Sequence, residues 1–311
     1  MARTAGSALD TIGDTPVVRL SRVVPDGCAD VFVKLESFNP TGSYKDRFAR
    51  AMVEGAEARG ELRPGMGVLE YTTGSTGSSL AFVCAVKGYP LRVVTTDAIA
   101  REKLRTMEAF GAELVIVASD GGRFTPDLVP RMMAEAKRLA AEPGVYWTNQ
   151  FYNPNLTDGY RAIASELSEQ LDGSPTAFCA GVGTAGMLLG VAEELRASGS
   201  RTRIVALEPA AAPLLSAGRH GSHRVEGIAV GIVQPRLTPD TYHEARAIEE
   251  AGARDMARRL AREEGVFVGT SSGLNVVGTI QLARELGPGH AVATVAVDTG
   301  LKYLAGDLFE A

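Results

Sequence analysis

Apolar and β-branched residues gather in short runs along the chain, and longer segments with a helical period separate these runs. The runs predict strands at 30–36, 67–72, 91–96, 112–118, 176–182, 203–209 and 290–298. Two of the intervening segments, 45–60 and 130–144, each carry apolar side chains on one stripe. These stripes consist of Phe48, Met52 and Ala56 in the first segment and of Met133, Ala136 and Ala140 in the second. Nearly continuous apolar strands that alternate with helices indicate an α/β fold with mostly parallel sheets covered on both faces.

Length and composition exclude several classes of protein. The chain has 311 residues and 45% hydrophobic content, which is enough for two domains with sizeable cores. A net charge of -5 leaves no basic stripe for a nucleic acid. The N-terminus has no apolar segment of the kind found in secretory signals, and no apolar run is long enough to span a bilayer. The three cysteines, Cys28, Cys84 and Cys179, are scattered. We therefore expect a cytoplasmic protein without a nucleic-acid partner, a membrane partner or a metal site.

Two loops that follow predicted strands have unusual compositions. In sheets of this kind, ligands bind in the loops at the carboxyl ends of the strands. The first loop, "NPTGSYKDR" (39–47), places Lys45 at the start of a helix, where an isolated lysine would ordinarily be solvated. The second, "TTGSTG" (72–77), offers hydroxyls and backbone N–H groups at a helix N-terminus. That composition is typical of an anion site and also of an ordinary Ser/Thr-rich helix cap.

A third loop, "GVGTAGM" (181–187), has the spacing of a dinucleotide-binding motif. Gly181, Gly183 and Gly186 match G-x-G-x-x-G, and Glu208 follows 22 residues after Gly186. Glycines and a helix N-terminus predict a phosphate site but do not identify the phosphate. A NAD-dependent dehydrogenase is therefore one interpretation. It leaves the first two loops without a function, whereas one cofactor that uses all three loops accounts for each of them.

A series of motifs in a fixed order carries a resemblance to a known family. The motifs are "IGDTPVVRL", "KLESFNPTGSYKDR", "EYTTGSTGSSLA", "GAELVIV", "NQFYNPN", "GVGTAGMLLGV", "VEGIAVG" and "GVFVGTSSGLN". The chain resembles the cysteine synthase (O-acetylserine sulfhydrylase) and cystathionine β-synthase family of fold type II pyridoxal-phosphate enzymes. The resemblance runs from about residue 10 to "DTGLKYLAGDLF" at the end of the chain.

The resemblance implies a tryptophan synthase β-like architecture of two domains, each an open, mostly parallel, twisted sheet flanked by helices. The smaller substrate-loop domain would span 38–152, and the larger domain, which binds the cofactor phosphate, would span 1–37 and 153–311. Gly, Pro and Asn residues in the stretch 149–160 also indicate a boundary there. The family further implies pyridoxal 5'-phosphate as cofactor and a homodimer.

Each of the three loops then receives an expected role. Lys45 matches the lysine that forms the Schiff base with the cofactor and moves the proton at the substrate Cα. The residues that match the phosphate-binding loop are Gly183, Thr184, Ala185, Gly186 and Met187. The residues that match the substrate-carboxylate loop are Thr72, Thr73, Gly74 and Thr76, joined by Gln150. Ser75 stands at the position that contacts the cofactor ring. Ser271 matches the partner of the pyridine nitrogen, with Ser272 as the alternative register.

The implied reaction is β-replacement on an activated L-serine through an aminoacrylate. A serine at the ring nitrogen does not hold a proton there, which disfavours transamination and favours prompt loss of a leaving group. Cysteine synthase, which converts O-acetyl-L-serine and sulfide into L-cysteine and acetate, is the leading interpretation. The same chemistry with another leaving group or nucleophile, a β-elimination of the cysteine desulfhydrase kind, and a non-catalytic ligand-binding relative are the alternatives. The presence of Lys45 and an intact loop 72–77 argues against the last.

Several positions depart from the family pattern and bear on the substrate. Ser75 replaces an asparagine, and Ala185 replaces a glycine. Met187 stands where a hydroxyl residue is usual, and Ala229 and Val230 replace smaller residues. Arg219 and His220 are candidate anchors for a phosphoserine, although flexible, solvated charges are the simpler interpretation of both.

Overall fold

The structure, a computed structural model of the chain, describes residues 4–122, 125, 127–229, 231 and 234–310. The chain divides into two compact units, and each unit contains its own sheet. The smaller unit comprises Met1–Ile12 and Asn39–Gly159, and the larger unit comprises Gly13–Phe38 and Tyr160–Ala311. The division into a domain of 38–152 and a domain of 1–37 and 153–311 stays a prediction. Two mostly parallel sheets with flanking helices confirm the predicted fold class.

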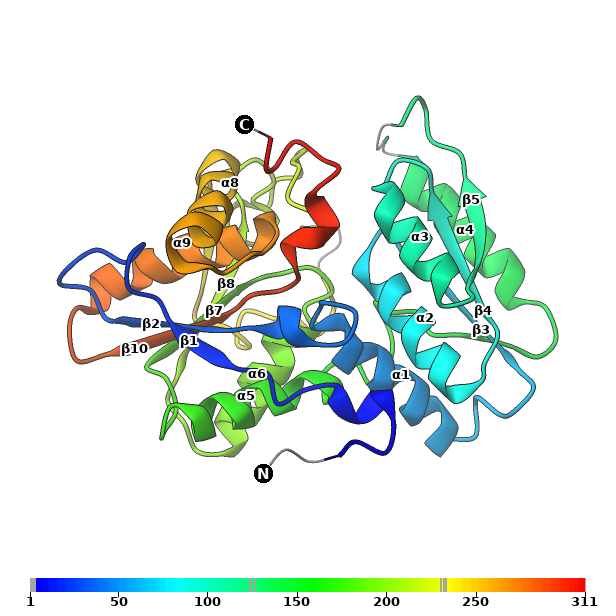
Figure 1. Ribbon diagram of the computed structural model, residues 1–311, viewed down its shortest axis with the longest axis horizontal. Coiled ribbons are helices and arrows are strands. Elements are labelled where there is room, and N and C mark those ends of the chain that lie inside the picture. Colours follow the sequence, from blue (N-terminus) through cyan, green and yellow to red (C-terminus); the bar gives the residue numbers. More distant parts are fainter. Residues whose placement is uncertain (1–3, 123–124, 126, 230, 232–233, 311) are drawn as a thin grey trace. The chain divides into compact units, whose positions relative to one another are not determined.

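The smaller unit contains a sheet whose described strands are all parallel, in the order β5-β4-β3-β6. The strands are β3 (Gly67–Tyr71), β4 (Leu91–Thr96), β5 (Glu113–Val117) and β6 (Val145–Trp147). The helices are η1 (Ala8–Thr11), α1 (Lys45–Ala58), α2 (Ser75–Lys87), α3 (Arg101–Ala109) and α4 (Leu128–Ala140). Figure 1 shows α2 and α3 along one side of this sheet and α4 along the other. Leu69, Tyr71 and Val94 form one core with the buried side chains of α4. Residue 70 points away from that core because side chains alternate along a strand.

The larger unit contains a sheet in the order β1-β2-β10-β7-β8-β9, of which only the pair β1–β2 is antiparallel among the described strands. The strands are β1 (Val17–Arg19), β2 (Asp30–Lys34), β7 (Ala177–Gly181), β8 (Arg203–Pro209), β9 (Glu244–Ile248) and β10 (Ala291–Val295). The helices are α5 (Asp158–Gln170), α6 (Gly186–Ala197), α7 (Leu214–Ala217), α8 (Glu250–Arg259), α9 (Thr270–Leu286), η2 (Glu36–Phe38), η4 (Gly300–Tyr303) and the π-helical turn η3 (Leu260–Glu264). In Figure 1, α8 and α9 lie on one face of this sheet, and α5 and α6 lie on the other.

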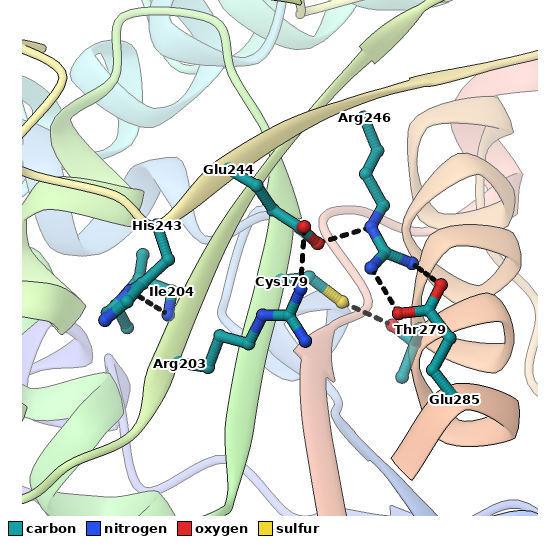
Figure 2. Close-up of polar contacts among 8 residues, drawn as sticks. All are labelled: Cys179, Arg203, Ile204, His243, Glu244, Arg246, Thr279 and Glu285. Atoms are coloured by element: carbon teal, nitrogen blue, oxygen red, sulfur yellow. Dashed lines mark hydrogen bonds and ion pairs between the residues drawn. The ribbon is translucent and has the colours of Figure 1, made fainter.

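The edge strand β9 has no apolar run, and its charged side chains form ion pairs instead. Glu244 accepts a hydrogen bond from Arg203 of β8 at 2.7 Å, and Arg246 binds Glu285 of α9 at 2.6 Å. Figure 2 shows Arg246 between Glu244 and Glu285, so its charge is matched on both sides. Strand pairing with β8 and these ion pairs stabilise a segment that hydrophobic periodicity does not detect.

Burial confirms one predicted helix stripe and shifts the other. Phe48, Met52 and Ala56 are fully buried in α1, as predicted. In α4 the buried stripe is Met132, Ala136 and Leu139, whereas Met133 and Ala140 are only half-buried. The prediction was therefore displaced by one residue on that helix, because consecutive methionines offer two registers with similar apolar content. None of the helices within the described ranges is long and apolar enough to cross a membrane.

Candidate active site

Lys45 is the first residue of α1, and its amine is buried against aromatic rings. Only 7% of the residue is exposed, and Nζ lies 4.9 Å from the ring centre of Tyr44 and 5.8 Å from that of Phe48. In the part of the chain that the structure describes, no carboxylate pairs with Nζ. Burial alone lowers the pKa of Lys45 from 10.5 to about 8. A lysine in this environment is a base and a nucleophile near neutral pH, unlike an ordinary solvated lysine.

The turn before Lys45 is held by the next residue, Asp46. Its carboxylate accepts hydrogen bonds from the backbone N–H and the hydroxyl of Thr41, at 2.7 and 2.5 Å. Gly42 takes a left-handed φ of 73° in this turn, and the hydroxyl of Ser43 accepts a hydrogen bond from the N–H of Lys45. Asp46 is fully buried, and sequence reasoning did not identify it. Its carboxylate ties the turn that contains Thr41 to the first turn of α1, next to Lys45.

The loop 72–77 and Gln150, which the sequence assigns to the substrate carboxylate, come together in the same unit. The hydroxyl of Thr76 donates to Oε1 of Gln150 at 2.8 Å, and Nε2 of Gln150 donates to the carbonyl of Tyr71 at 3.0 Å. Thr41 also contacts Ser79 of α2 at 3.3 Å between hydroxyl oxygens. The turn before Lys45 and the helix that follows the loop are thereby linked.

Exposure differs along this loop in a way that suits a ligand site. Thr72, Thr76 and Gln150 are buried, whereas Thr73, Gly74 and Ser75 remain half-exposed at the start of α2. The half-exposed residues stand at a helix N-terminus, where backbone N–H groups lack intrahelical partners, and the N–H of Gly74 donates to the hydroxyl of Thr72 at 3.2 Å. These N–H groups and hydroxyls suit a carboxylate.

In the larger unit, the loop 181–187 connects β7 to α6 and packs closely against the segment 227–229. A Cβ at Gly183 would lie 2.3 Å from the carbonyl oxygen of Gly227, so only glycine fits there. The N–H of Ala229 donates to the carbonyl of Val182 at 2.8 Å. Ala185 has a φ of 64° and Ala229 a φ of 48°, so both keep the left-handed conformation that favours glycine. Val230, the neighbouring departure from the family pattern, lies outside the described residues.

Two side chains that the sequence did not single out hold this region. Asn275 of α9 accepts a hydrogen bond from the N–H of Gly181 at 2.7 Å. The Nδ1 atom of His223 accepts a hydrogen bond from the N–H of Val225. Its Nε2 atom lies 3.2 Å from the carbonyl oxygen of Ala229. Because Nδ1 accepts, we assign the proton of the neutral ring to Nε2, which donates to that carbonyl. These contacts hold Gly181 and the segment 225–229, which lies against the loop before α6.

The remaining predicted residues differ in their surroundings. Ser271 is 2% exposed, and its hydroxyl has no hydrogen-bond partner among the described residues. The hydroxyl of Ser272 accepts a hydrogen bond from the N–H of Val297 at 2.9 Å. That contact uses only an acceptor position of Ser272, so its O–H can still donate, and Ser271 and Ser272 both stay register alternatives. Arg219 and His220 are exposed in the segment after α7.

Glu208 does not have the geometry that a dinucleotide site requires. Its two carboxylate oxygens accept the backbone N–H groups of Leu215 and Ser216, at 2.7 and 2.8 Å. A ribose-binding acidic residue needs an oxygen directed toward the sugar hydroxyl. Glu208 instead binds the backbone of α7, so the feature that suggested a dehydrogenase has a structural role.

Known proteins resemble the chain over nearly its full length. A family model described as "Pyridoxal-phosphate dependent enzyme" matches residues 8–298. A cysteine synthase of Staphylococcus aureus is 40% identical over 300 residues, which are 96% of this chain and 95% of that protein. The crystal structure of an O-ureido-L-serine synthase is 37% identical with a TM-score of 0.90, covering 99% of this chain and 96% of that one. An O-acetylserine sulfhydrylase isoform 3 from Entamoeba histolytica is 33% identical with a TM-score of 0.91, covering 99% and 92%.

Proposed function

The chain belongs to the family of pyridoxal-phosphate-dependent enzymes, and on that premise we propose that it catalyses β-replacement on an activated L-serine. The reaction we propose is that of a cysteine synthase, in which O-acetyl-L-serine and sulfide give L-cysteine and acetate. One observation carries the proposal. Burial lowers the pKa of the Lys45 amine to about 8, and the amine lies in the same unit as the loop 72–77.

The residues present fit pyridoxal 5'-phosphate. Gly183, Thr184, Ala185, Gly186 and Met187 would hold the phosphate, because Gly183 leaves no room for a side chain and the loop ends at the N-terminus of α6. Ser271 would donate its hydroxyl to the pyridine nitrogen, Ser75 would contact the ring, and Lys45 would hold the aldehyde carbon covalently. When bound, the cofactor supplies an electron sink that stabilises negative charge at the substrate Cα.

The side chains of the smaller unit would bind and deprotonate the amino acid. The loop residues Thr72, Thr73, Gly74 and Thr76, together with Gln150, would bind the substrate carboxylate. Once displaced from the cofactor, Lys45 would take the Cα proton, because its lowered pKa leaves much of the amine neutral near pH 8. The same amine would return a proton where the reaction requires one.

A test of this proposal is a panel of activated serines against several nucleophiles, with the products identified by mass. O-acetyl-L-serine, O-phospho-L-serine and L-cysteine would be combined with sulfide, thiols and N-hydroxyurea. The panel includes N-hydroxyurea because of the similarity to an O-ureido-L-serine synthase. L-cysteine from O-acetyl-L-serine and sulfide supports the cysteine synthase assignment. Pyruvate and sulfide from cysteine would indicate β-elimination instead, and no product from any pair would refute the proposal.

We further propose a homodimer in the cytoplasm that acts on an amino acid and a small nucleophile. The domain assignment 38–152 for the substrate loops, with 1–37 and 153–311 for the phosphate site, belongs to the same proposal. The family resemblance supports both. Light scattering of the purified protein would measure the mass against 32.7 kDa for one chain.

We expect the rate at which cofactor-free protein captures pyridoxal phosphate to depend on pH through Lys45. Burial lowers the pKa of this amine to about 8, and only the neutral amine attacks the aldehyde. The rate should therefore rise roughly tenfold for each pH unit below 8 and level off above it. Stopped-flow absorbance from pH 6 to 10 measures this. A rate that keeps rising to about pH 10 would mean that the amine titrates like a solvated lysine.

We expect Ser75→Asn to change the rate of acetate release from O-acetyl-L-serine more than it changes cofactor affinity. Asparagine offers a donor and an acceptor on a longer arm than the serine hydroxyl, so it can add a contact in the substrate loop. One hydrogen bond to a charged group corresponds to about 1.5–3 kcal/mol, or roughly tenfold to a hundredfold in rate. On a bulkier serine derivative the same change should lower the rate. Equal rates for both proteins on every substrate would show that Ser75 does not affect specificity.

A further inference from the structure

Glu70 is a fully buried carboxylate in the middle of the smaller unit. It lies on β3 with 0% of its surface exposed, and no lysine or arginine pairs with it within the described ranges. Its oxygens accept three hydrogen bonds. The N–H of Tyr71 donates to Oε1 at 2.8 Å, while the hydroxyl of Thr148 and the N–H of Gln150 donate to Oε2 at 2.7 and 2.8 Å. A buried carboxylate without a cation is costly, and these three donors offset only part of that cost.

The three donors belong to the two segments that form the candidate carboxylate site. Tyr71 is the last residue of β3 and immediately precedes the loop 72–77. Gln150 follows Asn149, which has a left-handed φ of 47° at the end of β6. The side chain of Gln150 then returns to the carbonyl of Tyr71 and to the hydroxyl of Thr76. The Glu70 carboxylate therefore binds the backbone of both Tyr71 and Gln150, the two residues that the Gln150 side chain links.

We propose that Glu70 is a positioning residue, whose carboxylate fixes the backbone of Tyr71 and Gln150 and thereby places the Gln150 amide against Thr76. The proposal rests on the proposed function, because it assigns the loop 72–77 to the carboxylate of an amino-acid substrate. Glu70 itself does not touch the substrate. It acts through Gln150 and through the start of the loop.

The hydrogen-bond pattern requires a carboxylate in this place. Each oxygen of Glu70 accepts one backbone N–H, from Tyr71 on one side and from Gln150 on the other. An amide of the same shape would direct its NH₂ group against one of these N–H groups, whichever way it is turned. Burial raises the pKa of Glu70 to about 7, although the hydrogen bonds from Thr148, Gln150 and Tyr71 favour the charged form. The chain retains the acid despite this cost, as expected for a group that holds a particular backbone geometry.

The test compares Glu70→Gln with Glu208→Gln as a matched control in the larger unit. Glu208 is 2% exposed, and its two oxygens also accept backbone N–H groups, from Leu215 and Ser216. The first measurement is amide hydrogen exchange of each holoenzyme. In Glu70→Gln, exchange should rise roughly tenfold in the peptides that cover 71–79 and 145–152. In Glu208→Gln, amide exchange should become faster in the peptide 209–217 and stay unchanged in 71–79 and 145–152.

The second measurement separates binding from chemistry. For Glu70→Gln, the KM for O-acetyl-L-serine should rise roughly tenfold or more while kcat changes about threefold or less, because the carboxylate loop contributes mainly to substrate binding. Affinity for pyridoxal phosphate should change by a smaller factor than KM, since the phosphate loop lies in the other unit. Thr148→Val, a nearly isosteric change, removes one donor to Glu70 and should raise KM by a smaller factor. It provides the same test if Glu70→Gln does not fold.

The outcomes distinguish this proposal from the proposed function. If the wild type converts no activated serine, the proposed function fails, and the exchange measurement still decides whether Glu70 holds Gln150. Unchanged exchange at 145–152 would overturn the positioning role. So would an equal effect of the Glu208 control on those peptides, or a loss of kcat at constant KM in both Glu70→Gln and Thr148→Val.

Discussion

Lys45→Ala is expected to lower the rate of β-replacement by roughly 10⁴ or more, because one amine would supply both the covalent attachment and the proton transfer at Cα. The phosphate loop lies in the other unit, so the variant should still bind pyridoxal phosphate without a covalent bond. Activity with O-acetyl-L-serine and sulfide measures the first effect. Cofactor absorbance after gel filtration measures the second.

Lys87→Ala is the matched control for this substitution. Lys87 ends α2 and pairs with Glu57 at 2.8 Å, and its side chain is 19% exposed. Its loss should leave turnover nearly unchanged. Borohydride reduction of the wild-type holoenzyme, followed by peptide mapping, should place the cofactor on Lys45. A label on Lys34, Lys87 or Lys103 would contradict the assignment.

The second large effect is expected from Gly183→Ala. A Cβ at this position would lie 2.3 Å from the carbonyl oxygen of Gly227, so the loop must move and displace the N–H groups that would bind the phosphate. Overpacking of this kind costs about 1–3 kcal/mol, which corresponds to roughly a fivefold to hundredfold loss of cofactor affinity. Titration of cofactor-free protein with pyridoxal phosphate measures the loss.

Gly252→Ala provides the control, because a Cβ there would meet nothing within 4 Å. This variant should bind the cofactor as the wild type does. Excess pyridoxal phosphate should restore much of the turnover of Gly183→Ala, since Lys45 and the substrate loop are unaltered. Wild-type affinity in Gly183→Ala would show that the loop 183–187 does not bind the phosphate.

Interior parallel strands were predictable from the sequence, whereas among the described edge strands only β5 was predicted, at 112–118. The apolar runs 91–96 and 203–209 coincide with β4 and β8 residue by residue, because both faces of an interior strand are covered. β1 and β6 were missed because each has only three residues. β9 was missed because its sequence, EARAI, carries charges, which pair with each other and with Arg203 and Glu285. A charged edge strand has no periodicity that separates it from a loop.

Loops with unusual composition were predictable as well, whereas their supports were not. The sequence singled out Lys45, Gln150 and the loop 72–77, and the structure brings Gln150 and the loop into contact. Glu70 and Asp46 were missed, although both are fully buried acids. A lone acidic residue next to a motif has no sequence signal that distinguishes a buried support from a solvated charge.

The sequence alone determined which family the chain resembles and predicted which loops carry chemistry, because glycines, hydroxyls and a lysine at fixed spacing form local motifs. Only the tertiary structure decided that burial lowers the pKa of the Lys45 amine to about 8, that the Ser272 hydroxyl accepts the N–H of Val297, and that Glu208 binds the backbone of α7. The physical reason is the same in each case. A pKa, a free lone pair and a filled hydrogen-bond site depend on neighbours from other segments, and folding alone brings those neighbours together.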